Sequence, residues 1–420
     1  MSPKKRILIL VENLPSPFDR RVWQEATTLQ AHGYGVSIIC PIGKGYEQHY
    51  EEIDGIHIYR YDLPIEAEGA KGYAVEYSAA LFHTFRLAWK VRREQGFDVV
   101  HACNPPDLLF LVGGFFKLFF GTKFLFDHHD INPELYEAKF GRRDFFWTLM
   151  VWLERMTFKT SDVSIATNES YKKIAIERGD MDPERVFVVR SGPKLDRLKI
   201  IPPVPALKKG RTYLVGYVGV MGKQEGIGLL LQAASHIVYG LGREDIHFGL
   251  VGGGTSLEDM KALAVKLDIT DYVTFTGRVP DQALLEMLNT ADVCANPDIA
   301  NEMNDKSTMN KIMEYMALGK AIVQFDLTEG RFSAEEASLY AAKNDPIDMA
   351  EKIVELLDNP ELRIKMGEHG RRRVENELEW RYEAPKLLRA YEVLFEQLQS
   401  SRTPITEGTC YEKNYSQDSH

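Results

Sequence analysis

Cysteine is scarce in this chain of 420 residues. The four that occur (Cys40, Cys103, Cys294 and Cys410) are scattered, with neither a CxxC pair nor a metal-site spacing. That distribution excludes a disulfide-rich secreted scaffold and favours reduced thiols in a cytoplasmic protein. The first apolar run, Ile7–Val11, is also shorter than the roughly 7–15 apolar residues of a secretory signal. We therefore expect a cytoplasmic location.

Long apolar runs are missing as well. The best candidate for a membrane span, Leu108–Phe126, contains Lys117, Lys123 and three glycines. A lysine near the middle of a bilayer costs roughly 2.5–3.5 kcal/mol on insertion scales. The segment is better explained by a buried helix followed by a strand.

The chain also lacks an excess of positive charge. The net charge is −10, which argues against a general nucleic-acid binder. Residues 1–200 hold 27 basic and 27 acidic side chains, so the whole acidic excess lies in residues 201–420. With 44% hydrophobic and 27% charged residues, the composition is typical of a folded chain and excludes a disordered scaffold.

Short apolar runs alternate with helical patterns along the sequence, which indicates parallel sheets covered on both faces. The helix expected first covers about residues 19–32. The expected strands are Ile7–Val11, Val36–Cys40, Val99–His101, Phe124–Phe126, Val163–Ala166 and Val186–Val189, then Tyr213–Tyr217, His247–Val251, Val273–Phe275, Val293–Ala295 and Ala321–Phe325.

The alternation pauses once, in a proline-containing and charged stretch, which predicts two successive α/β domains of Rossmann-like type. We assign residues 1–195 to the first domain, 196–212 to a linker and 213–379 to the second domain. A helix over 380–399 follows the second sheet, and the polar tail over 400–420 is expected to be disordered.

Ligands of open parallel sheets bind outside the carboxyl ends of the strands, so the predicted site is the cleft between the two domains. Two glycine-rich loops follow strands of the second domain. One consists of Gly252, Gly253 and Gly254, and the other contains Gly219, Gly222 and Lys223. Each either contacts a nucleotide or phosphate through its backbone or is a tight turn. Neither is a GxGxxG fingerprint or a Walker motif.

The segment over 304–320 is the most informative one. Ser307 or Thr308 is expected to cap a helix of about ten residues, with free amides and the flanking Lys306 and Lys311 facing an anion. Glu314 would lie two turns into that helix, within reach of a ligand's hydroxyl groups. The alternative is a capped helix with a Lys311–Glu314 surface pair.

In the first domain, Asp19, Arg20 and Arg21 open the helix after the first strand. Asp19 can cap this helix, whereas two arginines at its positive end favour contact with a phosphate or an acidic substrate. Later, His128, His129 and Asp130 follow a strand. They are too few for a metal site, so each histidine is either structural or faces the cleft.

Together these segments resemble the glycosyltransferases of family 4, which have the GT-B fold, over about residues 5–398. The matching motifs are Asp98-Val-Val-His101, Asp127–Asp130 with Pro133-Glu134, Ser164–Thr167, Gly252–Gly254, Phe275-Thr-Gly277-Arg278, Ala291-Asp292-Val293 and Lys311–Lys320. The opening over 19–25 resembles a subgroup that builds bacterial surface polysaccharides.

The resemblance implies transfer of a sugar from a nucleotide sugar with retention and without a metal or other cofactor. The donor would lie on the second domain and a lipid-linked or saccharide acceptor on the first, where Asp130 would also lie. Glu314 would bind the donor ribose, Gly252–Gly254 and Arg278 would lie near the base, and His129 near the transferred sugar. The last helix would cross back to the first domain.

The sequence departs from the family pattern at its phosphate-binding positions. The first glutamate of the usual E-x7-E pair is replaced by Lys306, and the usual arginine and lysine fall on Val220 and Glu225. Our hypothesis is that Lys306, with Lys223 or Lys311, replaces this clamp. Near-normal turnover of Lys306→Ala would contradict it.

Two other functions share this fold: a sugar-nucleotide epimerase, and a non-catalytic member that binds a nucleotide sugar or a partner. Segments 77–95 and 139–159 combine aromatic and basic side chains, as an anionic membrane surface requires. In the alternative interpretation, their aromatic side chains belong to the core and their charges to a solvated face.

Overall fold

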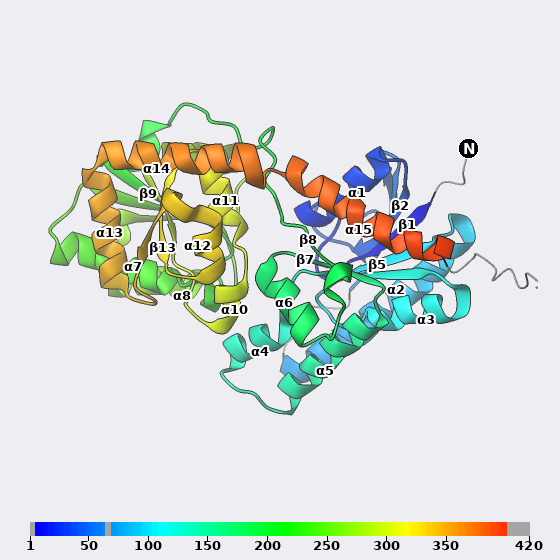
Figure 1. The fold of residues 1–420 in the computed structure, drawn as a ribbon. Coiled ribbons are helices and arrows are strands. Elements are labelled where there is room, and N and C mark those ends of the chain that lie inside the picture. Colours follow the sequence, from blue (N-terminus) through cyan, green and yellow to red (C-terminus); the bar gives the residue numbers. More distant parts are fainter. Residues whose placement is uncertain (1–4, 64–68, 401–420) are drawn as a thin grey trace, which may run out of the picture.

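The computed structural model describes residues 5–63 and 69–400, so Cys410 and the predicted tail from residue 401 onward lie outside the described residues. Two α/β domains lie side by side, and the last helix runs from the second back over the first (Figure 1). The predicted fold class is confirmed.

The first sheet has eight strands in the order β3-β4-β2-β1-β5-β6-β7-β8. They are β1 (Arg6–Leu10), β2 (Gly35–Pro41), β3 (Tyr50–Ile53), β4 (Ile56–Tyr61), β5 (Val99–Cys103), β6 (Lys123–His128), β7 (Val163–Ala166) and β8 (Val186–Val188). All neighbours are parallel except the β3–β4 hairpin. Sequence reasoning missed this hairpin, although Asp54-Gly55, with positive φ at both residues, is a favoured hairpin turn.

The second sheet is entirely parallel, in the order β11-β10-β9-β12-β13-β14. Its strands are β9 (Tyr213–Val218), β10 (Ile246–Val251), β11 (Val273–Gly277), β12 (Val293–Asn296), β13 (Ala321–Phe325) and β14 (Ser338–Ala341). The last of these was not predicted from the sequence.

Helices cover both faces of each sheet, as the continuously apolar strands require. In β1, Ile7 and Ile9 pack on one face, whereas Leu8 and Leu10 pack on the other. The helices are α1 (Arg20–Ala31), α2 (Gly69–Glu94), α3 (Phe110–Phe120), α4 (Asn132–Phe140), α5 (Phe145–Thr160), α6 (Glu169–Glu177), α7 (Ile227–Ser235), α8 (Leu257–Lys266), α9 (Asp281–Thr290), α10 (Glu302–Lys306), α11 (Asn310–Ala317), α12 (Thr328–Ala334), α13 (Pro346–Asp358), α14 (Pro360–Arg373) and α15 (Trp380–Ser400).

The apolar stretch over 108–126 forms helix α3 and strand β6, as predicted. Within the described part of the chain, none of the helices has the length and hydropathy needed to cross a membrane.

Helix α15 connects the two domains. A π-helical turn, Val374–Leu378, separates it from α14. A Cβ atom at Gly192, just after β8, would lie 2.6 Å from the backbone oxygen of Leu378, so glycine allows the chain to pass there. Beyond this point α15 packs on β7 and β8, and the indole of Trp380 donates to Oγ1 of Thr28 (2.9 Å). Its contacts therefore bring the C-terminal part of the chain onto the first domain.

Candidate active site

Loops that follow strands of both sheets contact one another between the domains. After β7, the side chain of Asn168 donates to the backbone oxygen of Lys306 (2.8 Å) and to Oγ1 of Thr308 (3.0 Å). The hydroxyls of Tyr171 and Ser307 lie 3.0 Å apart. Because open parallel sheets bind ligands beyond the carboxyl ends of their strands, this interface is the candidate active site.

Ser307 and Thr308 do not cap the following helix, which corrects the sequence prediction. The segment forms two short helices, α10 and α11, and α11 begins after Met309 without a side-chain cap. The hydroxyls of Ser307 and Thr308 instead bond to the first-domain side chains just described. The connection between α10 and α11 is therefore held by the facing domain.

Lys311 is nearly buried, with 9% of its side chain exposed. Its Nζ lies 2.8 Å from Oε2 of Glu225 and 2.8 Å from Oδ1 of Asp298. Burial alone would lower the pKa of Lys311, but the Asp298 carboxylate beside it raises that pKa well above its ordinary value. Lys311 is thus charged but already balanced, and the alternative of a Lys311–Glu314 surface pair is wrong.

Glu314 lies at the interface with 14% of its side chain exposed, and two arginines contact its Oε1 atom. Arg20, the first residue of α1, places Nη1 3.1 Å away, and Arg197, between the two sheets, places Nη2 against the same oxygen. Both arginines also contact Asp281, at 3.1 Å and 3.3 Å. Sequence reasoning missed Arg197 and Asp281, because nothing in their local sequence marks them.

The remaining predicted cations of the second domain differ in their surroundings. Nζ of Lys306 lies 2.6 Å from Oε1 of Glu302 and 3.9 Å from Oε1 of Glu134. Lys223 and Arg278 are exposed, and neither forms an ion pair with any residue that the structure describes.

The two glycine-rich loops pack against each other. Gly252 has a φ of +137°, and a Cβ atom there would lie 1.8 Å from the backbone oxygen of Gly219. At Gly254 an added Cβ would meet the backbone of the same opposing loop at 2.6 Å. These two glycines, Gly252 and Gly254, are therefore required by loop packing, whether or not a nucleotide lies nearby. Gly222 continues the loop after β9, ahead of Lys223.

Gly253 differs from the glycines on either side of it. A Cβ atom added at Gly253 would lie 3.5 Å from Cγ of Arg278, which is an ordinary contact, so loop packing does not require glycine there. Its backbone oxygen accepts from the amide of Met221 (3.1 Å) and is thus already used within the protein. The tight-turn interpretation therefore does not extend to Gly253, and its contact with a nucleotide stays a prediction.

In the first domain, Asp19 caps α1 as predicted, with its carboxylate accepting from the backbone of Val22 (3.1 Å). Arg21 is 8% exposed, and its Nη2 lies 2.7 Å from Oδ1 of Asp127 and 3.1 Å from Oε1 of Glu25. These buried carboxylates account for the position of Arg21 without a phosphate.

The pKa values of these two carboxyl groups shift in opposite directions. Burial raises the pKa of Glu25 well above its ordinary value, and the neighbouring Asp127 adds to the effect. Burial would also raise the pKa of Asp127, but the Arg21 guanidinium holds it well below its usual range. The guanidinium of Arg21 therefore favours the ionised form of Asp127, whereas burial favours the protonated form of Glu25.

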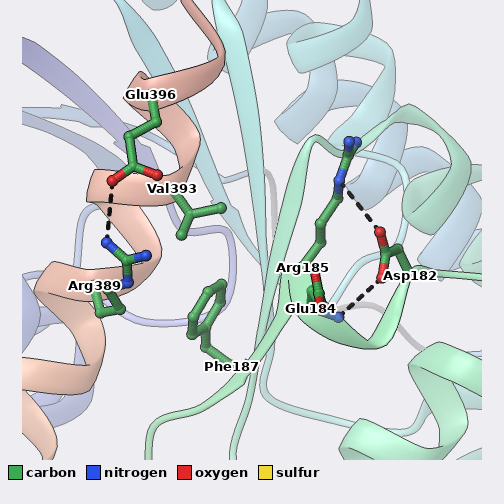
Figure 2. Close-up of a pocket in the computed structure, with 7 residues that line it drawn as sticks. All are labelled: Asp182, Glu184, Arg185, Phe187, Arg389, Val393 and Glu396. Carbon is green, nitrogen blue, oxygen red and sulfur yellow. Dashed lines mark hydrogen bonds and ion pairs between the residues drawn. The ribbon is translucent and has the colours of Figure 1, made fainter.

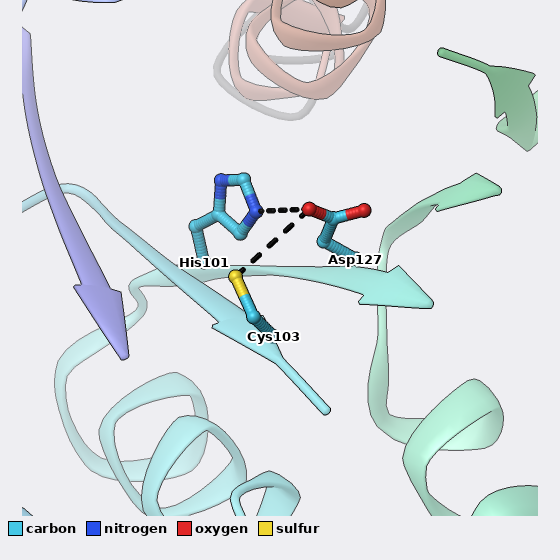
Figure 3. Close-up of side chains that lie close together, drawn as sticks. All are labelled: His101, Cys103 and Asp127. Atoms are coloured by element: carbon cyan, nitrogen blue, oxygen red, sulfur yellow. Dashed lines mark hydrogen bonds and ion pairs between the residues drawn. The ribbon is translucent and has the colours of Figure 1, made fainter. Parts of the chain in front are cut away.

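His101, Cys103 and Asp127 lie close enough together for one ligand atom from each to reach a metal ion (Figure 3). The charges around them favour a different role. Arg21 already balances Asp127, burial raises the pKa of the Cys103 thiol well above its ordinary value, and Nδ1 of His101 lies 2.8 Å from the hydroxyl of Tyr391 on α15. We interpret the group as part of the buried charge network.

The two histidines at the carboxyl end of β6, His128 and His129, differ in their surroundings. His128 is fully buried, with Nε2 3.5 Å from Oε1 of Glu154, and is structural. His129 is 14% exposed, and its Nε2 lies 2.5 Å from Oδ2 of Asp127. The side chain of Asn104 accepts from the backbone amides of His129 (2.7 Å) and Asp130 (3.1 Å) and so fixes this loop. Burial raises the pKa of the Asp130 carboxyl.

A pocket lies elsewhere, between α15 and the amino end of β8 (Figure 2). It is lined by Asp182, Glu184, Arg185, Phe187, Arg389, Val393 and Glu396. Because three of these residues precede β8, the pocket is at the opposite end of that strand from the domain interface. It is separate from the candidate active site.

Two family descriptions match adjacent parts of the chain. Residues 19–197 match Glycosyltransferase Family 4, and residues 212–359 match Glycosyl transferases group 1. Two parallel-sheet domains that meet at the carboxyl ends of their strands define the GT-B class. The chain belongs to the GT-B glycosyltransferases of the family 4 type.

A relative found by sequence and two solved structures with a similar fold agree with this assignment. An uncharacterised glycosyltransferase from Methanocaldococcus jannaschii is 24% identical over 253 residues, which are 58% of this chain and 60% of that protein. The chain thus spans less than two thirds of that relative. Sucrose-phosphate synthase from Thermosynechococcus elongatus has a TM-score of 0.79 at 18% identity, covering 94% of this chain and all of the other. Anabaena HepE in complex with UDP-glucose has a TM-score of 0.67 at 14% identity, covering 94% and 99%. These structures support the fold.

Proposed function

We propose that this chain is a retaining glycosyltransferase that moves a sugar from a nucleotide-sugar donor to a lipid-linked or saccharide acceptor in surface polysaccharide biosynthesis. The observation that carries the proposal is the position of Glu314. It stands on α11 in the second domain, at the interface, and faces the residues that follow β1 of the first. A partly exposed carboxylate there suits the paired hydroxyls of a ribose.

The donor would lie on the second domain, with its ribose on Glu314 and its base toward Arg278 and the Gly252–Gly254 loop. HepE, a neighbour in fold, is described in complex with UDP-glucose, which supports a nucleoside diphosphate sugar as the class of donor. Arginine and lysine side chains would balance the diphosphate, so the proposal includes no metal or other cofactor.

His129 would contact the transferred sugar from the first domain. Nε2 of His129 lies 2.5 Å from Oδ2 of Asp127 and accepts from Nε of Arg21 at 3.0 Å, so both contacts engage the same ring nitrogen. Nδ1 is then the ring nitrogen left to form a hydrogen bond with a sugar hydroxyl. The acceptor hydroxyl would attack on the face from which the phosphate leaves, and the leaving phosphate would take its proton.

Binding and turnover together separate this proposal from its alternatives. A thermal-shift screen with UDP-, GDP- and other nucleotide sugars identifies the donor, and transfer to lipid-linked saccharides is then assayed with it. A glycosyltransferase releases nucleotide in step with sugar transfer. An epimerase converts the sugar with the nucleotide attached, whereas a non-catalytic member binds without turnover.

A membrane-facing surface on the first domain would present a lipid-linked acceptor. On α5, Phe145 and Trp152 are 74% and 52% exposed. On α2, by contrast, Leu87 is buried and Trp89 packs against the core, so the core interpretation holds for most of segment 77–95. We propose that α5 and the exposed Phe119 of α3 bind the cytoplasmic face of an anionic membrane.

Vesicle binding tests this surface. Replacing both Phe145 and Trp152 by glutamate should abolish sedimentation with anionic vesicles. Replacing the exposed Ile364 of α14 by glutamate is the matched control and should leave sedimentation unchanged. Arg142→Glu with Arg143→Glu should weaken binding. If the aromatic and the charge-reversal variants both still sediment, the membrane surface is wrong.

A further inference from the structure

The donor site lacks a phosphate clamp at the positions where the family resemblance implies one. Val220 carries no charge, and Glu225 is paired with Lys311. Lys311 is in turn balanced by two carboxylates, and Lys306 is held by Glu302. These two lysines therefore offer little positive charge that is not already paired. Lys223 is exposed and forms no ion pair with a described residue, but it supplies a single charge, so the negative charges of a diphosphate require a further source.

Two arginines from outside the second domain converge beside Glu314. Arg20 comes from the first turn of α1, and Arg197 from the segment between the sheets. Cationic side chains at the positive end of a helix are unfavourable unless an anion is near. In this structure Glu314 and Asp281 are the anions that satisfy Arg20, both at 3.1 Å.

The ion pairs of Asp281 can exchange partners. The side chains of Arg20 and Asp281 are 53% and 54% exposed, and exposed ion pairs contribute little to stability. A guanidinium can bind a phosphate through two parallel hydrogen bonds. Once a ribose occupies the Glu314 carboxylate, both arginines lose one partner and can turn to the phosphates that follow the ribose.

We infer that Arg20 and Arg197 bind the donor diphosphate, and that Asp281 competes with the diphosphate for both of them. This inference rests on the proposed function, because it names the residues that hold the same donor. In this inference the two arginines, and not Lys306, are the principal source of the positive charge that binds the diphosphate.

Calorimetry with nucleoside diphosphates and the matching nucleosides tests the inference. UDP, GDP and ADP are titrated into the full chain, and the tightest binder is compared with its nucleoside. Arg197→Gln and Arg20→Gln should each weaken diphosphate binding about tenfold or more, the loss expected for one charged hydrogen bond, and leave nucleoside binding unchanged. Asp281→Asn should tighten diphosphate binding several-fold. Arg389→Gln, on the surface of α15, is the matched control and should bind like the wild type.

The outcomes separate this inference from the proposed function. Wild-type protein that binds none of the nucleotides contradicts both. A wild type that binds a diphosphate, together with arginine variants that bind it equally well, contradicts only the inference. Arginine variants that lose equal affinity for the diphosphate and for its nucleoside would show that the arginines have a structural role, and this result would also contradict the inference. Arg197→Lys, which keeps the charge, should recover part of the lost affinity and shows that the loss is not a folding defect.

Discussion

Nε2 of His129 lies 2.5 Å from Oδ2 of Asp127, and Oδ1 of the same carboxylate lies 2.7 Å from the buried guanidinium of Arg21. One ionised carboxylate thus joins a buried cation to the partly exposed histidine at the domain interface. The buried Asp127 and Arg21, which also places Nε 3.0 Å from Nε2 of His129, thereby fix the orientation of the residue proposed to contact the sugar.

Substitution of this histidine should affect catalysis more than donor binding. We expect His129→Ala to lower kcat about a hundredfold, because a preorganised hydrogen-bonding group at the reacting sugar is lost. The dissociation constant of the nucleotide should change little. Steady-state kinetics and calorimetry on the same variant measure both quantities, and an unchanged kcat would remove His129 from the proposed mechanism.

Glu25 and Asp127 should respond differently to replacement by their amides. Burial raises the pKa of Glu25 and so favours its neutral form, which glutamine resembles, and Glu25→Gln should therefore change the free energy of unfolding little. Asp127→Asn leaves Arg21 buried without its ion-pair partner and should cost about 3–5 kcal/mol. Urea denaturation at pH 7 measures both variants. Equal losses would contradict the assigned charge states.

Glu12 predicts a pH dependence of stability. It follows β1, is 3% exposed, and burial together with Glu76 raises its pKa from 4.5 to about 7. The folded state therefore holds this proton more tightly than the unfolded state. The resulting stability is complete below about pH 4.5 and is lost as the pH rises to about 7, a total of about 3 kcal/mol.

Glu12→Gln stays neutral at every pH and removes this loss. Relative to the wild type, its free energy of unfolding should rise by about 2.5 kcal/mol between pH 5 and pH 8, the part of the total loss that falls in this range. Urea denaturation of both proteins across this range provides the comparison. A difference that stays constant with pH would show that Glu12 does not titrate in this way.

Substitution of Lys306 tests whether this lysine or the two arginines, Arg20 and Arg197, supply the positive charge for the donor diphosphate. Because Nζ of Lys306 is held by Glu302, we expect Lys306→Ala to bind the nucleoside diphosphate within about threefold of the wild type. Turnover should also stay close to that of the wild type. A loss as large as that of Arg197→Gln would restore Lys306 as part of the phosphate clamp.

Much of the fold could be predicted because its signals are local. Apolar runs at regular intervals identified most strands of both sheets, and Asp19 marked the start of α1. The β3–β4 hairpin was missed because its strands are short and partly polar. The break between α10 and α11 was missed because Ser307 and Thr308 bond to the facing domain rather than to the next helix.

The site was harder to predict because its contacts join distant parts of the chain. Arg197 and Glu314 are 117 residues apart, and their pairing depends on how the domains meet. The sequence placed Arg20 and Arg21 together, yet one turns to the interface and the other into the core. The buried carboxylates of Glu25 and Asp127, the second of which is 106 residues from Arg21, explain that difference.

Donor binding by wild-type protein and by Glu314→Gln tests the central claim most directly. We predict that calorimetry with a panel of nucleotide sugars finds at least one that binds the wild type, and that Glu314→Gln binds it about tenfold or more weakly, because a charged acceptor for the ribose hydroxyls is lost. A panel in which nothing binds, or a Glu314→Gln variant that binds as tightly as the wild type, would contradict the proposed donor site.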